Sequence, residues 1–369
     1  MKILVAPNAF KGSIDADDAA SIIGSTLLSC NQELELDICP IADGGDGTCF
    51  LLGKALGLKR VEKYALDAIG RPYLGFYYLQ EDQQAAYFDI STVSGLKNLK
   101  SHQMNPRIAS SYGTGELIQH ANSHGAKNII LGLGGSASID LGIGILRALG
   151  YLFLDENGRE LSMFSESLLQ RISHIQIPIK KIDLRFTVLC DVGNTFFGPN
   201  GAIPVFGLQK GLEIASQGDY FRDCERFIEI LSKKIKKDIP DQAGFGAAGG
   251  IAYGLSHFFP VNIKMGSKYF FEQINMKNRI RKADLIITGE GRYDYQSASG
   301  KGSYELLQLA KKHQKKTILI TSGNDGLHDG FDQVGSLPDL DFENQNFKAI
   351  AEENLRQVII DIYRSIKAS

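Results

Sequence analysis

Glycine-rich segments with ionisable side chains are the part of this sequence best suited to chemistry. Six segments rich in small residues follow an expected strand or open an expected helix: 7–13, 42–48, 134–140, 190–194, 244–250 and 288–294. Glycine lets backbone N–H groups approach a ligand closely. The start of a helix adds unpaired donors and a partial positive charge, which together favour phosphate. One such loop is weak support for a phosphate site, but several are hard to explain by packing alone.

The acidic side chains of these segments predict a site for a divalent cation. They are Asp43, Asp46, Asp140, Asp191, Glu290 and Asp294. If three of them converge, their repulsion is large, because two unit charges about 4 Å apart at an effective dielectric of about 20 interact by about 4 kcal/mol. Mg²⁺ would offset this repulsion, since it prefers a few carboxylates together with phosphate oxygens. Phosphate-binding loops beside Mg²⁺-binding carboxylates are typical of phosphoryl transfer.

Each of these residues also has a purely structural explanation, and these alternatives stay open at this point. Lys11 could be an ordinary surface lysine, and Asp140 could cap its helix. Asp294 could form a surface ion pair with Arg292. Asp191 is the hardest to explain in this way, because it ends a strand that reads as buried.

The elements that position these segments predict an α/β protein. A strand, a helix, a strand and a helix are expected at 2–6, 15–29, 34–38 and 48–56. This alternation is typical of a parallel sheet with covering helices. The same character returns near the other end of the sequence, with strands and helices expected at 283–288, 303–312, 316–321 and 352–366.

The region between these two stretches has a different order of elements. Three successive strands are followed by a helix, a strand, a helix and a strand, at 61–66, 72–79, 85–90, 115–124, 128–132, 140–149 and 186–190. A meander of this kind belongs to a second sheet. The simplest topology therefore inserts a mixed α/β domain, residues 61–283, into a doubly wound domain made of residues 1–60 and 284–369.

Composition excludes several classes of protein. The chain has 369 residues, 43% of them hydrophobic, and a net charge of −2, so it lacks the basic excess of a nucleic-acid binder. No apolar run approaches the roughly 20 residues of a membrane helix, and the N-terminal run is too short for a signal peptide. The five cysteines show no C-x-x-C spacing, which favours reduced thiols in a cytoplasmic protein.

Several familiar motifs are missing. Residues 298–303 come near the P-loop pattern but miss its spacing, and the protein-kinase motifs do not occur. The glycines of 132–142 do not form the G-x-G-x-x-G pattern of a dinucleotide site. The seven histidines have no spacing typical of zinc ligands.

Taken together, the segments resemble those of the bacterial glycerate kinase family, type 1, from Met1 to about Ile366. The matching stretches are APNAFKGSIDADDAA, PIADGGDGT, GTGELI, GLGGSASIDLGIGILRALG, CDVGNTFFGPNGAIPVFGLQKG, GFGAAGGI and ADLIITGEGRYDYQSASGKG. The resemblance implies ATP-dependent phosphorylation of D-glycerate. The product in this family is generally 2-phosphoglycerate, although 3-phosphoglycerate is assigned as the product of some members. It also implies a flavodoxin-like doubly wound parallel sheet with an inserted α/β domain akin to the restriction-endonuclease fold.

This sequence departs from the family pattern at a few positions. Asn8 and Ala9 stand where the family usually has aspartate and serine, and Ile139 and Leu141 flank Asp140 where Asn and Gly are usual. The choice of substrate is therefore open. A kinase for another small hydroxy acid is one alternative, and a catalytically weakened relative that binds a phosphate ligand is another.

The hypothesis for the site has ATP·Mg²⁺ and glycerate meeting in a cleft between the two domains. The candidates are, for catalysis, Lys11, Asp43, Asp191 and Arg292; for cofactor binding, Gly12, Ser13, Gly134, Gly135, Ser136 and Glu290; and for Mg²⁺, Asp43, Asp140, Asp191 and Asp294. Arg292 would grip the glycerate carboxylate, because a planar guanidinium matches it in a bidentate way. Asp43 and Asp191 would act as Mg²⁺ ligand or as base. The expected partners are small molecules, and a homo-oligomer is possible.

Overall fold

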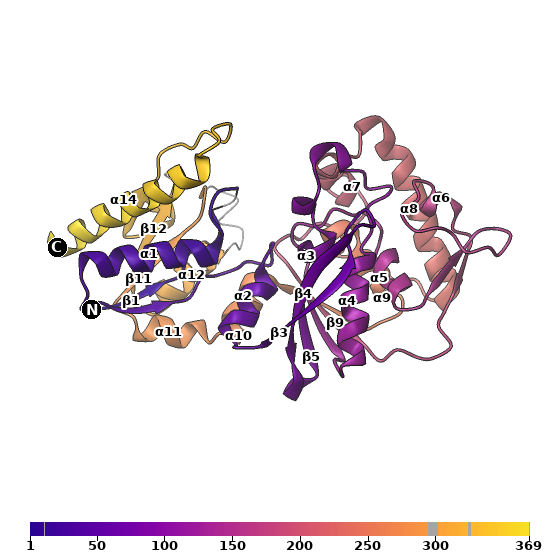
Figure 1. The fold of residues 1–369 in the computed structure, drawn as a ribbon, viewed down its shortest axis with the longest axis horizontal. Coiled ribbons are helices and arrows are strands. Elements are labelled where there is room, and N and C mark those ends of the chain that lie inside the picture. The colour runs from indigo at the N-terminus through magenta and orange to yellow at the C-terminus, as the bar shows by residue number, and fades with distance from the viewer. Residues whose placement is uncertain (11, 294–301, 324–325, 369) are drawn as a thin grey trace. The chain divides into compact units, whose positions relative to one another are not determined.

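The computed structural model describes residues 1–10, 12–293, 302–323 and 326–368 (Figure 1). The chain divides into two compact units. The terminal unit consists of Met1–Asp43 and Gly266–Ser369, and the central unit consists of Gly44–Met265. The chain therefore passes from one unit to the other twice, after Asp43 and before Gly266.

The terminal unit contains a five-stranded parallel sheet. Its strands are β1 (Lys2–Val5), β2 (Glu35–Ile38), β11 (Leu285–Gly289), β12 (Lys316–Thr321) and β13 (Gln333–Ser336). They lie in the order β13-β12-β11-β1-β2, and every neighbouring pair is parallel. Renumbered along the chain within this unit, the order is 2-1-3-4-5, which is the flavodoxin-like doubly wound arrangement.

Helices cover both faces of this sheet. They are α1 (Ala16–Cys30), α10 (Gly266–Gln273), α11 (Met276–Lys282), α12 (Gly302–Lys312), α13 (Gly326–Asp329) and α14 (Phe347–Ala368). Alternate strand residues such as Ile3 and Ile287 pack with Ile23 of α1 and Leu355 of α14 in one core cluster. Leu319 packs on the other face in a cluster that includes Leu307 of α12. Because both faces of the central strands are buried, β1, β11 and β12 are largely apolar, whereas the edge strands β2 and β13 are more polar and more exposed.

The central unit contains a mixed six-stranded sheet in the order β10-β9-β6-β5-β4-β3. The strands are β3 (Lys59–Leu66), β4 (Pro72–Gln80), β5 (Ala85–Asp89), β6 (Asn128–Gly132), β9 (Arg185–Cys190) and β10 (Val261–Met265). The first three pair as an antiparallel meander, as the sequence predicts, and the other three add in parallel from β5. Two short strands, β7 (Leu152–Leu154) and β8 (His174–Gln176), pair antiparallel in a separate two-stranded sheet.

Helices of the central unit surround this sheet. They are α2 (Thr48–Ala55), α3 (Ser91–Ser94), α4 (Tyr112–Ser123), α5 (Ile143–Ala148), α6 (Leu168–Arg171), α7 (Ala202–Phe206), α8 (Ile214–Ile235) and α9 (Ile251–Ser256). The unit has its own large hydrophobic core, which shares no residue with the cores of the terminal unit. Among the described helices, none has the length and hydropathy needed to cross a membrane.

The compact units differ from the sequence-based domain bounds in a few elements. Helix α2 packs on β5 and β4, and so it belongs to the central unit, although the bounds 1–60 and 284–369 would place it in the other domain. Helices α10 and α11 pack on α12 and lie in the terminal unit, although the range 61–283 includes them. The bounds of the compact units differ from the expected ones because α2 packs against strands of the central unit, whereas α10 and α11 pack against a helix of the terminal unit.

Candidate functional site

The terminal unit has a pocket at the carboxyl ends of its strands. The strand order reverses between β1 and β11. From β1 the next strand along the chain, β2, lies on one side, and from β11 the following strands, β12 and β13, lie on the other. The loops after these two strands are joined at this point, where Asn8 N donates to Gly289 O at 2.8 Å. Ligands of open α/β sheets bind in the crevice at such a switch point.

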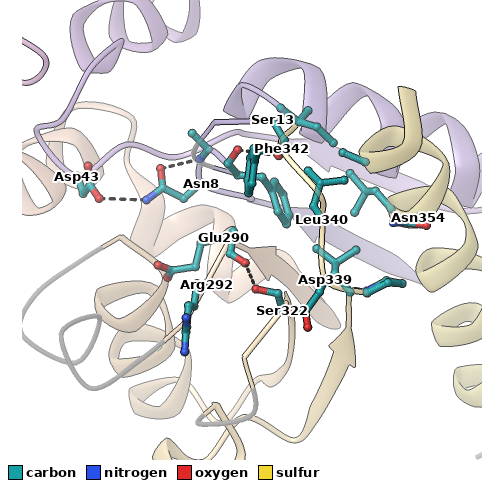
Figure 2. A pocket seen from close by; sticks show the side chains of 18 residues that line it. Asn8, Ser13, Asp43, Glu290, Arg292, Ser322, Asp339, Leu340, Phe342 and Asn354 are labelled. Atoms are coloured by element: carbon teal, nitrogen blue, oxygen red, sulfur yellow. Dashed lines mark hydrogen bonds between the residues drawn. The ribbon is translucent and has the colours of Figure 1, made fainter. Parts of the chain in front are cut away.

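This pocket has a volume of about 440 Å³ and two chemically different ends (Figure 2). Its walls are formed by Asn8, Ala9, Phe10, Ser13, Ile14, Asp43, Glu290, Gly291, Arg292, Ser322, Leu337, Pro338, Asp339, Leu340, Phe342, Ala351, Asn354 and Leu355. Polar side chains from the loops after β1, β2 and β11 gather at one end, and apolar side chains from the segment after β13 and from α14 form the other.

Asn8 and Asp43 form a buried pair at the polar end. The Asn8 amide Nδ2 donates to Asp43 Oδ2 at 3.1 Å, and its Oδ1 accepts from Ala9 N at 2.8 Å. Both side chains are less than one tenth exposed. An aspartate at position 8 would put a second carboxylate against Asp43, whereas the amide found here offers it a hydrogen-bond donor.

Arg292 extends from a segment that is fixed against the end of β12. Ser322 donates to Gly291 O through its backbone N at 3.1 Å and its Oγ at 2.7 Å. Tyr293 N donates to Thr321 Oγ1 at 2.8 Å. Arg292 lines the pocket, and within the described residues its guanidinium makes no ion pair or hydrogen bond.

The pocket brings together four of the residues selected from the sequence, Ser13, Asp43, Glu290 and Arg292. Gly12 precedes Ser13 with φ of +86°, a conformation that favours glycine. The other two candidates of this unit, Lys11 and Asp294, lie outside the described residues.

The central unit has a smaller pocket of about 140 Å³ at the carboxyl ends of β6 and β9. These strands are parallel neighbours with Gly132 opposite Leu189, so the loops that follow them start side by side. The pocket is lined by Leu96, Leu133, Gly134, Gly135, Ser136, Cys190, Asp191, Val192, Phe206, Gln209, Lys210, Ala247 and Ala248. Four residues selected from the sequence, Gly134, Gly135, Ser136 and the half-buried Asp191, are thus found together.

Glycine is required at position 134 by the close approach of another loop. A Cβ atom there would lie 2.2 Å from Gly45 C and 2.3 Å from Asp46 N. The neighbouring Asp46 is held by Ser91 Oγ and by Lys97 Nζ. The glycine segments 44–47 and 134–136 therefore pack backbone to backbone beside this pocket.

Asp140 lines neither of these two pockets, and both of its carboxylate oxygens accept hydrogen bonds. Its Oδ2 accepts from the Ser111 backbone N and Oγ, both at 2.8 Å, and from Gly144 N at 3.2 Å. Its Oδ1 accepts from Ser138 Oγ at 3.1 Å and Gly142 N at 3.2 Å. These donors fill the carboxylate, so Asp140 holds its loop and the start of α5, and we do not retain it as a Mg²⁺ ligand.

Lys210 is a residue of the central pocket that the sequence reasoning did not select. Its Nζ donates to Ser138 O at 2.7 Å, and the side chain is almost fully buried. Burial lowers the pKa of Lys210 to about 7, and the nearby Asp140 carboxylate opposes this shift. The only signal in the sequence was its position in the Gln-Lys-Gly turn of the FGLQKG stretch.

Neither pocket holds a complete set of protein ligands for a metal ion. Within the part of the chain that the structure describes, no three His, Cys, Asp or Glu side chains are grouped as ligands. Asp43 and Asp191 nevertheless carry the hard oxygen atoms that Mg²⁺ prefers. Each of them, in its own unit, fits an ion that is otherwise bound by water and by substrate phosphates.

A pocket at the switch point of a doubly wound sheet, and a second one built from small residues and a carboxylate, are typical of an α/β enzyme that acts on small molecules. Comparison with known proteins is more specific. The family model described as the glycerate kinase family matches residues 3–367. The chain therefore belongs to the glycerate kinase family, and it is a phosphotransferase with an alcohol group as acceptor.

Individual relatives are similar along most of the chain. Glycerate kinase from Bacillus subtilis (strain 168) is 34% identical, with 87% of this chain and 84% of that protein aligned. Glycerate 2-kinase from Escherichia coli (strain K12) is 33% identical, with the same two shares of 87% and 84%. A crystal structure assigned as glycerate kinase 2 from Salmonella typhimurium LT2 is 30% identical, has a TM-score of 0.83 and covers 100% of this chain and 98% of its own. This match and the two sheets confirm the two-part α/β fold.

Proposed function

We propose that the protein transfers the γ-phosphoryl group of ATP to the 2-hydroxyl group of D-glycerate and forms 2-phosphoglycerate. The observation that carries this proposal is the family match over residues 3–367, because that range includes both pockets. The five cysteines are free, which suits the reducing conditions of the cytoplasm. We therefore propose the cytoplasm as the place where the enzyme works.

In the central unit, the small pocket suits a phosphoryl group. The backbone N–H groups of Gly134, Gly135 and Ser136 would donate to phosphate oxygens, as N–H groups of glycine loops do. Asp191 lines the same pocket and would serve as a Mg²⁺ ligand or as the base that accepts the proton of the attacking hydroxyl. Lys210 would hold the loop through Ser138 O and keep these donors in place.

In the terminal unit, the polar end of the pocket suits an anionic substrate. The Arg292 guanidinium would bind the planar carboxylate of glycerate in a bidentate way. The Asn8 amide fixes Asp43, which would serve as the alternative base or Mg²⁺ ligand. Lys11, with the N–H group of Gly12, would contact phosphate oxygens, whereas the Ser13 N–H donates to Phe10 O at 2.9 Å.

When bound, Mg²⁺ would neutralise charge on the phosphates, with Asp191 or Asp43 as a carboxylate ligand. Catalysis of phosphoryl transfer is largely positioning and electrostatic stabilisation. The residues of both pockets would therefore bind and orient the two substrates, and one carboxylate would take the hydroxyl proton.

The test of this function is the identity of the product. Purified protein is incubated with ATP, Mg²⁺ and one acid at a time, and ADP release is followed with D-glycerate, L-glycerate, tartronate and hydroxypyruvate. We expect the fastest release with D-glycerate and a phosphorus NMR signal of 2-phosphoglycerate. A signal of 3-phosphoglycerate would show that the 3-hydroxyl group is phosphorylated and not the 2-hydroxyl group. Faster ADP release with another acid would identify that acid as the substrate. No ADP release with any acid would refute the proposal.

Asp191→Asn tests the part that the carboxylate plays. Removing a preorganised charged contact from such a site costs about 10²–10³ in turnover. We expect kcat with D-glycerate to fall by at least about 100-fold while the circular dichroism spectrum and the melting temperature stay those of the parent. Asp183→Asn is the matched control, because Asp183 is exposed in the same unit and lines neither pocket. Activity of Asp191→Asn within a few-fold of the parent would remove Asp191 from the mechanism.

A further inference from the structure

The apolar end of the pocket in the terminal unit has no role in the binding of glycerate as described above. The pocket volume of about 440 Å³ lies in the range of sites that enclose a ligand of drug-like size. A three-carbon acid rich in hydroxyl groups would fill only a small part of it. It would also leave the apolar wall without a partner.

That wall is a preformed surface. Ile14, Ala351 and Leu355 belong to the hydrophobic core between α1, α14 and the sheet, and Leu337 and Leu340 pack against the same core. All five line the pocket. Because they are fixed by the core, they offer a rigid apolar surface, which suits a flat ring more than a flexible chain.

An exposed aromatic ring stands at the same end of the pocket (Figure 2). Phe342 is 58% exposed although its side chain lines the pocket, and its neighbour Phe347 has its ring centroid 5.7 Å away. A Cβ atom on Gly12 would lie 3.2 Å from Phe342 Cε1, so the ring lies next to the loop after β1. An exposed phenyl ring of this kind is a platform on which a nucleobase stacks.

Two polar groups complete this end of the pocket. Asn354 is half-buried on α14, and Asp339 is exposed in the segment after β13. Within the described residues, neither side chain makes a hydrogen bond or an ion pair. An asparagine amide matches the donor and acceptor of the adenine edge, and a carboxylate accepts from an amino or a ribose hydroxyl group.

We infer that this end of the pocket binds the adenosine part of the nucleotide, with the base against Phe342 and Leu340 and its polar edge towards Asn354. The phosphates would extend to the polar end, at the switch point of the sheet and near Arg292. This inference rests on the proposed function for its choice of a nucleotide as ligand. It assigns the nucleoside to the terminal unit alone.

Phe342→Ala and Asn354→Leu test the assignment in the full-length enzyme. Base stacking on an aromatic side chain contributes about 1–3 kcal/mol, so Phe342→Ala should raise KM for ATP and the Kd of ADP by about 5- to 150-fold. KM for D-glycerate should change less than two-fold. Asn354→Leu should lower the preference for ATP over GTP, because the group that reads the base edge is lost. Ile350→Ala is the control, since Ile350 is an exposed apolar residue of α14 that does not line the pocket.

Binding of inorganic tripolyphosphate separates the nucleoside from the phosphates. Phe342→Ala should leave its Kd in isothermal titration calorimetry unchanged, while the Kd of ADP rises. An unchanged ADP affinity in Phe342→Ala, or a rise in KM for D-glycerate alone, would overturn the assignment. ADP binding is measured without an acceptor acid. A parent protein that binds ADP through Phe342 but phosphorylates no acid would therefore refute the proposed function and leave this inference standing.

Discussion

At the level of single residues, the amide at position 8 explains how a departure from the family pattern fits this pocket. Asn8 donates to Asp43 and accepts from Ala9 N, so both of its polar groups are used. The polar end of the pocket then carries the carboxylates of Asp43 and Glu290 and not a third one from position 8. A site with fewer carboxylates depends more on phosphate oxygens and water to complete the shell of a magnesium ion.

Lys210 is the second residue with unusual chemistry. A buried ammonium group loses its hydration, so burial lowers its pKa, here to about 7. The hydrogen bond to Ser138 O can be donated by either the charged or the neutral amine. Lys210 can therefore keep the loop in place when it has lost its charge.

The pKa of Lys210 predicts how the stability of the protein depends on pH. In the unfolded chain the amine keeps its proton up to about pH 10.5, whereas in the folded protein it loses the proton near pH 7. Between these values the unfolded state holds one more proton, so the free energy of unfolding rises with pH, by up to about 1.4 kcal/mol per pH unit. Below pH 7 both states are protonated, and this contribution is constant at its least favourable value.

Urea unfolding of the parent and of Lys210→Met between pH 6 and pH 9 measures this contribution. The difference in unfolding free energy, parent minus variant, should be flat up to about pH 7 and should rise above it. The exposed Lys234 serves in Lys234→Met as a control with a flat difference. A flat difference for Lys210→Met as well would mean that the buried amine titrates like an ordinary lysine.

At the level of elements, the central site depends on two backbone segments that touch. The loop after β6 can approach residues 44–47 only because position 134 has no side chain. Asp140 then fixes the far end of the same loop through five hydrogen bonds shorter than 3.3 Å. The donor groups of Gly134–Ser136 are thus held between two rigid points, as a preorganised anion site requires.

Gly134→Ala measures the importance of this contact. The added methyl group would overlap with the backbone of Gly45 and Asp46, and overpacking of this kind costs about 1–3 kcal/mol. We expect a loss of that size in urea unfolding, together with lower kcat. Gly193→Ala is the matched control in the same unit, because a Cβ atom there meets no atom within 4 Å and its φ is not positive. Equal stabilities of the two variants would show that the loops can separate at no cost.

Several periodic elements of the fold could be predicted from the sequence, although the 22-residue helix α8 was not among them. The strands at β1, β6, β9, β11 and β12 are short apolar runs, and the structure has them within two residues of the expected ranges. Strands β10 and β13 were not predicted, because they are half-exposed edge strands without a clear alternation. Helix α5 begins at Ile143 and not at 140, because Leu141 and Gly142 adopt positive φ after Asp140.

The site could be predicted only in part. The sequence indicates which loops follow parallel strands, and so it brought Asp43 together with Glu290, and Gly134 with Asp191. It could not indicate that the Asp140 carboxylate accepts hydrogen bonds from Ser110 and Ser111, because contacts between residues about 30 positions apart depend on the tertiary fold. The apolar end of the terminal pocket was not predicted for the same reason. Phe342 lies far along the chain from segment 7–13, and only the fold brings it to the same pocket.

At the level of the whole molecule, one chain carries two large sheets with separate cores and a pocket on each. The central unit is inserted between β2 and α10 of the terminal unit, so the terminal sheet is completed only by residues that follow the insertion. Strand β1 pairs with β11, which lies about 280 residues further along the chain. The terminal unit therefore depends on contacts between distant parts of the sequence, whereas the meander of the central unit pairs neighbouring strands.

This organisation predicts that a nucleotide protects the two units unequally. If ADP binds to the terminal unit as inferred above, it stabilises that unit by about 2.7 kcal/mol at 100 times its Kd. Amides of β1, β11 and β12 that exchange by unfolding should then exchange about 100-fold more slowly in hydrogen–deuterium exchange mass spectrometry. Amides of β5 and β6 should change little, because their core shares no residue with the other. Equal protection of both sheets would mean that the units unfold together. Protection of β5 and β6 alone would place the nucleotide in the central unit, and this outcome would overturn the assignment of the pocket beside Phe342.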